Sequence, residues 1–463
     1  MPRSAADVRR VIKAYDVRGL VDSEIDEAFV ADVGAAFARL MRGEGGSRVV
    51  IGYDMRESSP RLAAAFAGGV TAQGLDVVRI GLASTDELYF ASGLLECPGA
   101  MFTASHNPAA YNGIKLCRAR AKPVGEDTGL AVVRQEVIDG PGQGWTGARG
   151  TVRDQDVLGE YGAFLRSLVD LRGLRPMRVA VDAGNGMAGH TAPAVLGGIA
   201  GLSVLPLYFE LDGTFPNHEA NPLEPANLVD LQDYVLRTGA DVGLAFDGDA
   251  DRCFVVDERG RPVSPSAITA LVADRELARE PGARVIHNLI TSRAVPEVIA
   301  ERGGTPVRSR VGHSYIKALM ADSGAIFGGE HSAHYYFRDF WGADSGMLAA
   351  LHVLAALGGQ DRPLSELMAA YQRYADSGEI NFRVEDAPAC VDAVVKSFAA
   401  QTVSVDNLDG VTVDLGDGAW FNLRTSNTEP LLRLNVEART ADEVAAIVAA
   451  ATEQITAGAG ARR

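Results

Sequence analysis

Three aspartates, Asp247, Asp249 and Asp251, alternate along one short polar segment. In an extended or looped backbone, this spacing places all three carboxylates on one side of the chain. Three unpaired carboxylates would repel one another, and a hard divalent cation such as Mg²⁺ removes that repulsion by taking their oxygens as ligands. The segment by itself indicates either such a metal site or an acidic turn between two strands.

An EF-hand calcium loop is the alternative metal site for this segment. Glu258 does stand at the twelfth position counted from Asp247, as a calcium loop requires. The sixth position, however, is Arg252 where the loop needs glycine, and the apolar run from Cys253 to Val256 predicts a strand. The sequence therefore excludes an EF-hand.

A serine stands in a second polar segment, Thr103-Ala-Ser-His-Asn-Pro, directly after a predicted strand. Asn107-Pro108 and Asn112-Gly113 favour turns, His106 is adjacent to the serine, and Lys115 follows ten residues after it. Gly-x-Ser-x-Gly is absent, which argues against a hydrolase. A hydroxyl beside a metal ion and cations suits a phosphoryl acceptor, and the other interpretation of Ser105 is a helix N-cap.

A third polar segment is Gly329-Glu-His-Ser-Ala-His. Glu330 and Ser332 offer a carboxylate and a hydroxyl side by side, which suits the vicinal hydroxyls of a sugar. His331 and His334 could form half of a zinc site, but no third ligand is close in sequence. A buried polar turn is the alternative.

The segment Arg424-Thr-Ser-Asn-Thr-Glu-Pro lies between two predicted strands. It combines a guanidinium, three hydroxyls, a side-chain amide and several backbone N–H groups, which together suit a phosphate clamp. A plain polar loop is the alternative.

One motif indicates a different class of protein. Gly184-Asn-Gly-Met-Ala-Gly follows a strand, and Glu210 lies about 20 residues further on, as in dinucleotide-binding folds. An NAD-dependent dehydrogenase is therefore the competing function. It leaves the aspartates, the serine segment and the phosphate clamp unexplained.

An internal repeat organises most of these segments. Three stretches share the order of a strand, a helix rich in Ala with Leu or Val, a second strand and a third strand. Their first strands begin at Arg48, Arg178 and Arg284, their second at Val77, Val204 and Val307, and their third at Gly99, Asp241 and Gly324. Each third strand runs into one of the first three polar segments. Because ligands bind beyond the carboxyl ends of parallel strands, we expect one cleft lined by all three.

The chain beyond about residue 378 has a different pattern. A strand from Ile380, a helix from Cys390 to Ala400, a hairpin over 411–423, a strand from Leu431 and a helix from Ala441 to Ile455 predict an α+β domain.

Composition bounds the class of protein. The chain has 463 residues, a formal net charge of −16, 47% hydrophobic and 22% charged residues. The length predicts three or four folded domains or one very large one, and the composition excludes a disordered chain. The acidic balance argues against binding to nucleic acid. The uncharged stretch 190–209 contains prolines and glycines, so a helix, a turn and a buried strand are expected rather than a membrane span.

Cysteine usage and the N-terminus bear on the compartment. The four cysteines are far apart and form no C-x-x-C pair, so neither a disulfide framework nor a structural zinc site is expected. They are Cys97, Cys117, Cys253 and Cys390. The first residues lack the apolar region of a signal peptide. A cytoplasmic protein without a membrane association is therefore expected.

Taken together and in this order, the motifs resemble those of the α-D-phosphohexomutases, within them the bacterial phosphomannomutase/phosphoglucomutase group. The resemblance spans almost the whole chain. The matching segments are Lys13-Ala-Tyr-Asp-Val-Arg-Gly, Thr103-Ala-Ser-His-Asn-Pro, Asp247-Gly-Asp-Ala-Asp-Arg, Gly312-His-Ser-Tyr-Ile-Lys, Gly329-Glu-His-Ser-Ala-His and Arg424-Thr-Ser-Asn-Thr-Glu-Pro. Asp182-Ala-Gly-Asn-Gly also looks like a loop of this family, which weakens the dinucleotide interpretation.

The resemblance implies an α/β fold of three related domains with mixed sheets and a C-terminal α+β domain, arranged around a central cleft. We expect a phosphoserine-loop domain over 1–150, a metal-loop domain over 151–257, a sugar-binding domain over 258–372 and a phosphate-binding domain over 373–463.

The resemblance also implies a mechanism. Phosphorylated Ser105 would transfer its phosphoryl group to a hexose phosphate, and a hexose 1,6-bisphosphate would turn over before Ser105 takes back the other phosphate. One Mg²⁺ per chain would be held by Ser105, Asp247, Asp249 and Asp251. The other implied catalytic residues are His106, Lys115, Arg18, Arg252 and His313. The implied substrate-binding residues are Glu330, Ser332, His334, Lys317, Arg424, Ser426, Asn427, Thr428 and Arg433.

Substrate choice rests on two details of the resemblance. The His-Ser-Ala-His ending of the third segment and Asn427 look like the mannose/glucose enzymes rather than the glucosamine enzymes. Mannose phosphate is the expected substrate, glucose phosphate or both sugars the alternative, and glucosamine phosphate a weaker one. A local positive cleft must offset the net negative charge. It would be made by Arg18, Lys115, Arg252, Arg308, Arg310, Lys317 and Arg424. A monomer or a homodimer is expected.

Overall fold

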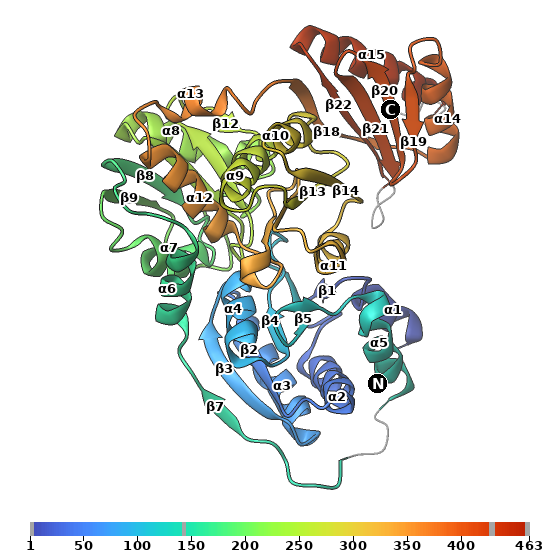
Figure 1. Ribbon diagram of the computed structural model, residues 1–463. Coiled ribbons are helices and arrows are strands. Elements are labelled where there is room, and N and C mark those ends of the chain that lie inside the picture. The colour runs from blue at the N-terminus through green and yellow to red at the C-terminus, as the bar shows by residue number, and fades with distance from the viewer. Residues whose placement is uncertain (1–3, 141–144, 426–430, 459–463) are drawn as a thin grey trace. The chain divides into compact units, whose positions relative to one another are not determined.

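The predicted threefold repeat is present in the structure. The computed structural model describes residues 4–140, 145–425 and 431–458 (Figure 1). In each repeat the first strand pairs in parallel with the second on one side and with the third on the other. The first strands are β2 (Arg48–Tyr53), β8 (Met177–Asp182) and β13 (Arg284–Asn288); the second are β3 (Asp76–Leu82), β9 (Leu202–Leu207) and β14 (Thr305–Ser309); the third are β4 (Gly99–Phe102), β10 (Val242–Phe246) and β15 (Phe327–Gly329).

Helices connect these strands at equivalent places. The first helix of each repeat follows the first strand, and the second helix precedes the third strand. The first helices are α3 (Ser59–Ala72), α7 (Ala188–Leu196) and α10 (Ala294–Glu301), and the second are α4 (Thr85–Leu95), α8 (Val229–Thr238) and α11 (His313–Ser323).

The first sheet has the order β1-β5-β4-β2-β3-β7, with β6 paired to β5. β5 returns antiparallel to β4, so the sheet is mixed and the serine segment forms the connection between these two strands. The remaining elements here are α1 (Ala5–Val11), β1 (Val17–Leu20), α2 (Glu27–Gly43), β5 (Tyr111–Arg118), β6 (Lys122–Pro123), η1 (Glu126–Thr128), α5 (Leu130–Asp139) and β7 (Val152–Asp154).

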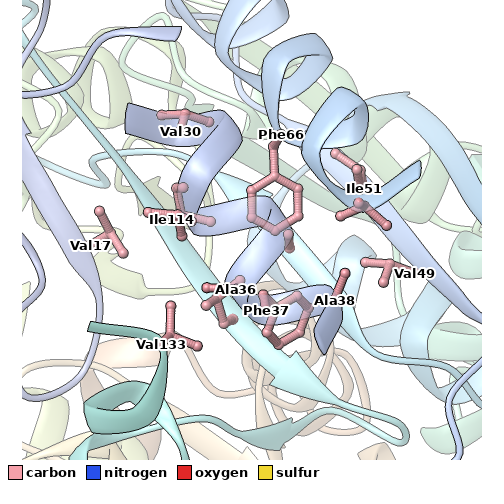
Figure 2. Close-up of a cluster of buried hydrophobic side chains, with 14 of the residues drawn as sticks. Val17, Val30, Ala36, Phe37, Ala38, Val49, Ile51, Phe66, Ile114 and Val133 are labelled. Atoms are coloured by element: carbon pink, nitrogen blue, oxygen red, sulfur yellow. The ribbon is translucent and has the colours of Figure 1, made fainter. Parts of the chain in front are cut away.

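Aromatic and β-branched side chains fill the core of this sheet (Figure 2). Phe37 of α2 and Phe66 of α3 pack with ring centroids 6.1 Å apart, and Val49 and Ile51 of β2 belong to the same buried cluster. Val50 between them is also fully buried, on the opposite face. The continuous apolar run of β2 is thus explained by burial on both faces.

The second sheet repeats the pattern with the order β12-β11-β10-β8-β9. β11 returns antiparallel to β10, as β5 does to β4, and the segment with the three aspartates joins β10 to β11. The other elements are α6 (Leu158–Leu168), η2 (Pro225–Leu228), β11 (Cys253–Asp257) and β12 (Pro262–Val263).

The chain forms two compact units, Met1–Val263 with Ser332–Leu367, and Ser264–His331 with Met368–Arg463. The first unit contains the two sheets described above and also β16 (Tyr335–Phe337), η3 (Arg338–Phe340), β17 (Ala343–Asp344) and α12 (Gly346–Gly358). The second contains α9 (Pro265–Arg279) with the strands and helices of the third repeat. The short helix α13 (Leu364–Met368) lies at the boundary.

The C-terminal part of the second unit is the predicted α+β fold. An antiparallel sheet of order β18-β22-β21-β20-β19 shares one buried cluster with two helices. The elements are β18 (Ala375–Arg383), α14 (Ala387–Ser397), β19 (Ser404–Asp406), β20 (Val411–Gly416), β21 (Ala419–Thr425), β22 (Leu431–Ala438) and α15 (Ala441–Gly458). β19 was not predicted, because its three residues are too few to show an alternating pattern.

Two other sequence expectations concern helices and thiols. Among the described residues, no helix has both the length and the apolar character needed to cross a membrane. The stretch 190–209 supplies most of α7, a turn and β9, as predicted. The expectation that the strand is buried is wrong, because β9 lies at the edge of its sheet and its residues are half-buried or exposed. All four cysteines are buried free thiols.

Candidate active site

Ser105 lies in a tight loop immediately after β4. Its backbone has a φ of 50°, its N–H donates to the Thr103 hydroxyl over 2.9 Å, and its side chain is nearly buried. The residues around it form turns, so the helix N-cap interpretation of Ser105 is wrong. The turn expected at Asn112-Gly113 is also wrong, because both residues lie within β5. A non-glycine residue in the left-handed region is uncommon and marks a backbone that the surrounding structure holds in place.

The three aspartates lie in a turn between β10 and β11, as the alternative interpretation expects, but all three are buried rather than exposed to solvent. One carboxylate oxygen from each aspartate lies within 4.8 Å of the other two. One oxygen of Asp249 and one of Asp251 are buried without a hydrogen-bond partner. Buried carboxylate oxygens without partners are costly, and a metal ion is the ligand that satisfies several of them at once.

The loop that contains Ser105 (the serine loop, 103–110) contacts the loop that contains the three aspartates (the aspartate loop, 247–252). The Ser105 hydroxyl donates to Oδ2 of Asp247 over 2.8 Å. Gly248 allows this approach, because a Cβ atom at that position would lie 2.4 Å from the Ser105 carbonyl oxygen. The predicted nucleophile is therefore hydrogen-bonded to one of the predicted metal ligands.

Two cations pair with the aspartates. Lys115 of β5 places Nζ 2.6 Å from Oδ2 of both Asp249 and Asp251. Arg252 donates from Nε to Asp247 over 2.9 Å, and its Nη2 is 3.4 Å from the Ser105 hydroxyl. Arg252 therefore places positive charge beside the Ser105 hydroxyl, and Lys115 places it on Asp249 and Asp251.

Two further predicted catalytic residues, His106 in the serine loop and Arg18 on β1, make hydrogen bonds at this site. Arg252 donates to Nδ1 of His106 over 2.6 Å, and Arg18 donates to the Asn107 side chain over 2.6 Å and to the Ala104 carbonyl over 3.3 Å. All the predicted catalytic residues with described side chains thus lie together. The side chain of His313 lies outside the described set.

Burial and neighbouring charges raise the pKa values of Asp247 and Lys115 and lower those of Asp249 and His106. Burial raises the pKa of Asp247 to about 7, although Arg252 opposes this. Burial would also raise the pKa of Asp249, but Lys115 holds it well below its usual range. Burial tends to lower the pKa of Lys115, yet the two aspartates raise it well above the usual value. Burial, with Arg252 and Arg18, lowers the pKa of His106 well below its usual value, so its imidazole is neutral.

Ser332 and His334 of the third segment belong to the same unit as Ser105. The Ser332 hydroxyl is 2.9 Å from Nδ1 of His334, and Nε2 of His334 is 3.7 Å from Oδ1 of Asp251. His331 belongs to the other unit, where its Nδ1 is 3.4 Å from the Ser266 hydroxyl. His334 lies with Asp251 and Asp344 in a group that could hold a metal ion, because one ligand atom of each lies within 4.8 Å of the others. A zinc site shared by His331 and His334 stays a prediction.

The remaining predicted substrate residues lie in the second unit. Glu330 is buried and accepts hydrogen bonds from the N–H of Gly312 over 3.0 Å and from the Asn288 amide over 3.3 Å. Lys317 is also buried, and Arg308 forms an ion pair with Asp406. Residues Ser426, Asn427 and Thr428 lie outside the described residues.

Arg424 and Arg433 converge on one carboxylate that the sequence did not single out. Their Nη2 and Nη1 atoms lie 3.5 Å and 3.3 Å from the two oxygens of Glu379 on β18. Thr85 of the first unit was also missed; its hydroxyl donates to Asp249 over 2.6 Å. Its place at the start of α4, after the end of β3, was the only available signal.

The glycine-rich segment after β8 has a structural explanation. A Cβ atom on Gly189 would lie 2.2 Å from the Phe209 carbonyl oxygen, and one on Gly186 would lie 2.8 Å from the Gly248 carbonyl oxygen. These glycines therefore permit close backbone packing, in one case against the aspartate loop itself. The dinucleotide interpretation is not supported.

A hydroxyl nucleophile, an acidic metal-capable cluster and paired cations in one place form an arrangement that can transfer a phosphoryl group. Comparison with known protein families supports this chemistry. The descriptions of phosphoglucomutase/phosphomannomutase domains match in four consecutive segments: alpha/beta/alpha domain I at 9–136, domain II at 160–260, domain III at 264–374 and the C-terminal domain at 379–454.

Individual relatives cover nearly the whole chain. Phosphohexose mutases of Xanthomonas campestris pv. campestris are 41% identical over 433 residues, covering 92% of this chain and 94% of the relative. A phosphomannomutase of Escherichia coli (strain K12) is 39% identical over 441 residues, with the same two coverages. The crystal structure of a phosphoglucomutase/phosphomannomutase family protein from Burkholderia thailandensis has a TM-score of 0.88 at 31% identity, covering 98% of each chain.

The chain therefore belongs to the phosphoglucomutase/phosphomannomutase family. Its activity is that of an isomerase, a phosphohexomutase.

Proposed function

We propose that this phosphohexomutase interconverts mannose 1-phosphate and mannose 6-phosphate through phosphorylated Ser105. The observation that carries the proposal is the 2.8 Å hydrogen bond from the Ser105 hydroxyl to Asp247. It puts a nucleophilic oxygen on the acidic cluster, with Arg252 beside it. Positioning and electrostatic stabilisation then supply most of the catalysis, as is general for phosphoryl transfer.

In the proposed cycle, the bond between phosphorus and Ser105 Oγ breaks as a bond to the free sugar hydroxyl forms, giving a hexose 1,6-bisphosphate. The bisphosphate turns over in the site, and Ser105 takes back the other phosphoryl group. Added bisphosphate would also act as an activator by phosphorylating Ser105. Lys115, whose pKa lies well above the usual value, acts here as a fixed cation rather than as a base.

The proposed metal is one Mg²⁺ per chain, held by Asp247, Asp249, Asp251 and an oxygen of phosphorylated Ser105. The residues fit such an ion, because buried oxygens of Asp249 and Asp251 lack hydrogen-bond partners. When bound, Mg²⁺ would neutralise charge on the transferring phosphoryl group.

For substrate recognition, we assign the sugar hydroxyls to Glu330 and Ser332 and the non-reacting phosphate to Arg424 and its neighbours. Arg433, which shares Glu379 with Arg424, and Lys317 and His334 complete this assignment. A broader specificity that includes glucose phosphate is the second candidate. It is favoured by the name phosphohexose mutases carried by relatives that are 41% identical.

A substrate panel followed by ³¹P NMR tests the proposal. The purified protein, Mg²⁺ and a trace of hexose 1,6-bisphosphate are given mannose, glucose or glucosamine 1-phosphate. We expect the 6-phosphate to appear fastest from mannose. Ser105→Ala should abolish turnover and the phosphoserine detected by mass spectrometry, whereas Ser203→Ala, on the exposed side of β9, should change neither. Normal turnover by Ser105→Ala would reject Ser105 as the carrier.

A further inference from the structure

Arg56 is a buried arginine that the mechanism above does not use. It lies three residues beyond the end of β2, the strand that pairs with β4 and thus runs beside the strand that leads to Ser105. Only 2% of Arg56 is exposed. A buried guanidinium is costly unless all of its N–H groups are bonded, so the partners of Arg56 show what it does.

All five N–H donors of the guanidinium are satisfied. Nε donates to Oδ2 of Asp54 over 3.2 Å. The other four N–H groups donate to four backbone carbonyls, three in the serine loop and one at the first residue of β5. These carbonyls belong to Ser105 (2.9 Å), Asn107 (2.6 Å), Pro108 (2.9 Å) and Tyr111 (3.0 Å). One planar side chain therefore binds backbone carbonyls from Ser105 through to the start of β5.

The guanidinium itself is held from two sides. Asp54 also accepts from the Arg56 N–H over 3.1 Å and from the Ser59 hydroxyl over 2.6 Å, which fixes its carboxylate. The ring of Phe215 lies 5.2 Å from the guanidinium carbon. Arg56 is thus anchored by Asp54 and by the Phe215 ring, both of which lie outside the serine loop.

This matters for Ser105 because its backbone is held in the left-handed region, at a φ of 50°. Such a conformation persists only where surrounding contacts over-determine it. The Arg56 bond to the Ser105 carbonyl and the Thr103 bond to the Ser105 N–H fix the peptide groups on both sides of that residue.

We propose that Arg56 is a positioning residue for phosphoryl transfer. Its planar guanidinium, with five N–H donors, fixes the serine loop so that Ser105 Oγ stays within hydrogen-bond distance of Asp247. The proposal rests on the proposed role of Ser105. Lysine could not replace it, because an ammonium has three donors and no plane to span four carbonyls.

The test compares Arg56→Lys and Arg56→Gln with the control Arg61→Gln. Arg61 lies on α3 and makes only partly exposed ion pairs with Asp22 and Glu27. Turnover is measured after treatment with hexose 1,6-bisphosphate and divided by the fraction of chains that carry phosphate on Ser105, found by intact mass. This normalisation removes the effect of unfolded or unphosphorylated protein.

A displaced nucleophile should lower kcat per phosphorylated site by about 100-fold for both Arg56 variants. KM should stay within about threefold, because substrate contacts are unchanged. Arg61→Gln should leave both constants near those of the wild type. A normal kcat per phosphorylated site in Arg56→Lys, even with a lowered melting temperature, would overturn the proposal and leave Arg56 a purely structural residue.

Two further measurements keep the outcome decisive. If neither Arg56 variant folds, Asp54→Asn keeps the volume but weakens the hold on the guanidinium, and it should lower the same kcat by about tenfold; an unchanged kcat would reject the proposal. If the wild type carries no phosphate on Ser105 and Ser105→Ala turns over normally, the proposed function itself fails, whatever the Arg56 variants do.

Discussion

The hydroxyl of Ser105 donates to Oδ2 of Asp247 over 2.8 Å, although 142 positions separate the two residues. Each residue lies in a loop between the third strand of its repeat and an antiparallel return strand, β4 to β5 and β10 to β11. The carboxyl ends of parallel strands are where such loops collect functional side chains. Repetition of one strand pattern has therefore supplied both halves of the site.

The contact between the two loops depends on Gly248. In Gly248→Ala the new Cβ would lie 2.4 Å from the Ser105 carbonyl, so the loops must separate. We expect kcat to fall by about 100-fold, the scale of a nucleophile displaced by about 1 Å. Steady-state kinetics with mannose 1-phosphate measure this.

Gly68→Ala is the matched control for this change. Gly68 lies within α3, where a Cβ would meet nothing within 4 Å. Alanine should stabilise the helix by about 1 kcal/mol and leave kcat unchanged. Equal kinetics in the two variants would show that the loop contact does not matter for turnover.

Asp249→Asn should weaken metal binding. One Asp249 oxygen is buried with no hydrogen-bond partner, as expected of a ligand position. We expect the Mg²⁺ concentration for half-maximal activity to rise by at least about tenfold. Loss of a residue that only supports a metal ligand already lowers metal affinity by roughly 10- to 100-fold. Calorimetric Mg²⁺ titration gives an independent reading. Asp170→Asn, on the exposed surface, is the control, and an unchanged Mg²⁺ requirement in Asp249→Asn would remove Asp249 from the ligand set.

Lys115→Met should destabilise the metal-free protein. Lys115 is 2.6 Å from both Asp249 and Asp251, and its loss leaves two buried carboxylates without their cation. Removing one partner of a buried ion pair typically costs roughly 3 kcal/mol or more. Urea unfolding in EDTA measures the loss, and added Mg²⁺ should stabilise the variant more than the wild type.

Lys122→Met on β6 provides the comparison, since Lys122 is exposed. It should unfold like the wild type with and without Mg²⁺. If Lys115→Met were as stable as Lys122→Met in EDTA, Lys115 would not be neutralising the aspartates.

Much of this site could be predicted because its residues stand in patterned segments. The aspartates at alternate positions and the serine after a strand showed their chemistry in sequence, and the repeat placed their loops at equivalent strand ends. The contact of Lys115 with Asp249 and Asp251 could not be predicted, because it depends on the pairing of β5 with β4 across the sheet.

Arg56 and Thr85 were missed for a different reason. Each acts through a single side chain in an ordinary segment, and neither arginine nor threonine is unusual after a strand. Their roles appear only in three-dimensional packing, where Arg56 meets four carbonyls and Thr85 meets Asp249. β19 was missed because three exposed or half-buried residues carry no periodicity.

Glu87 gives a prediction about stability and pH. It lies in the first turn of α4, is 1% exposed, and one of its carboxyl oxygens has no hydrogen-bond partner. Burial, with Asp86 beside it, raises the pKa of Glu87 from 4.5 to about 8. The folded protein therefore keeps a proton on Glu87 through a pH range in which the unfolded chain has lost it.

Proton linkage gives the direction in which the free energy of unfolding changes with pH. Between pH 4.5 and about 8, the folded state binds more protons at this site than the unfolded state, so stability falls as pH rises. Glu87→Gln removes the titration and keeps the shape. Its stability advantage over the wild type should grow by up to about 1.4 kcal/mol per pH unit across this window and then level off.

Urea unfolding of both proteins at several pH values from 5.5 to 8.5 measures this difference. Glu27→Gln should behave in the opposite sense, because Arg61 lowers the pKa of Glu27. A lowered pKa stabilises the fold above the unfolded-state value, so this variant should lose a small amount of stability at neutral pH. A constant difference between Glu87→Gln and the wild type would mean that Glu87 is ionised in the folded state at neutral pH. The buried start of α4, next to Thr85 and its bond to Asp249, would then have to hold a negative charge.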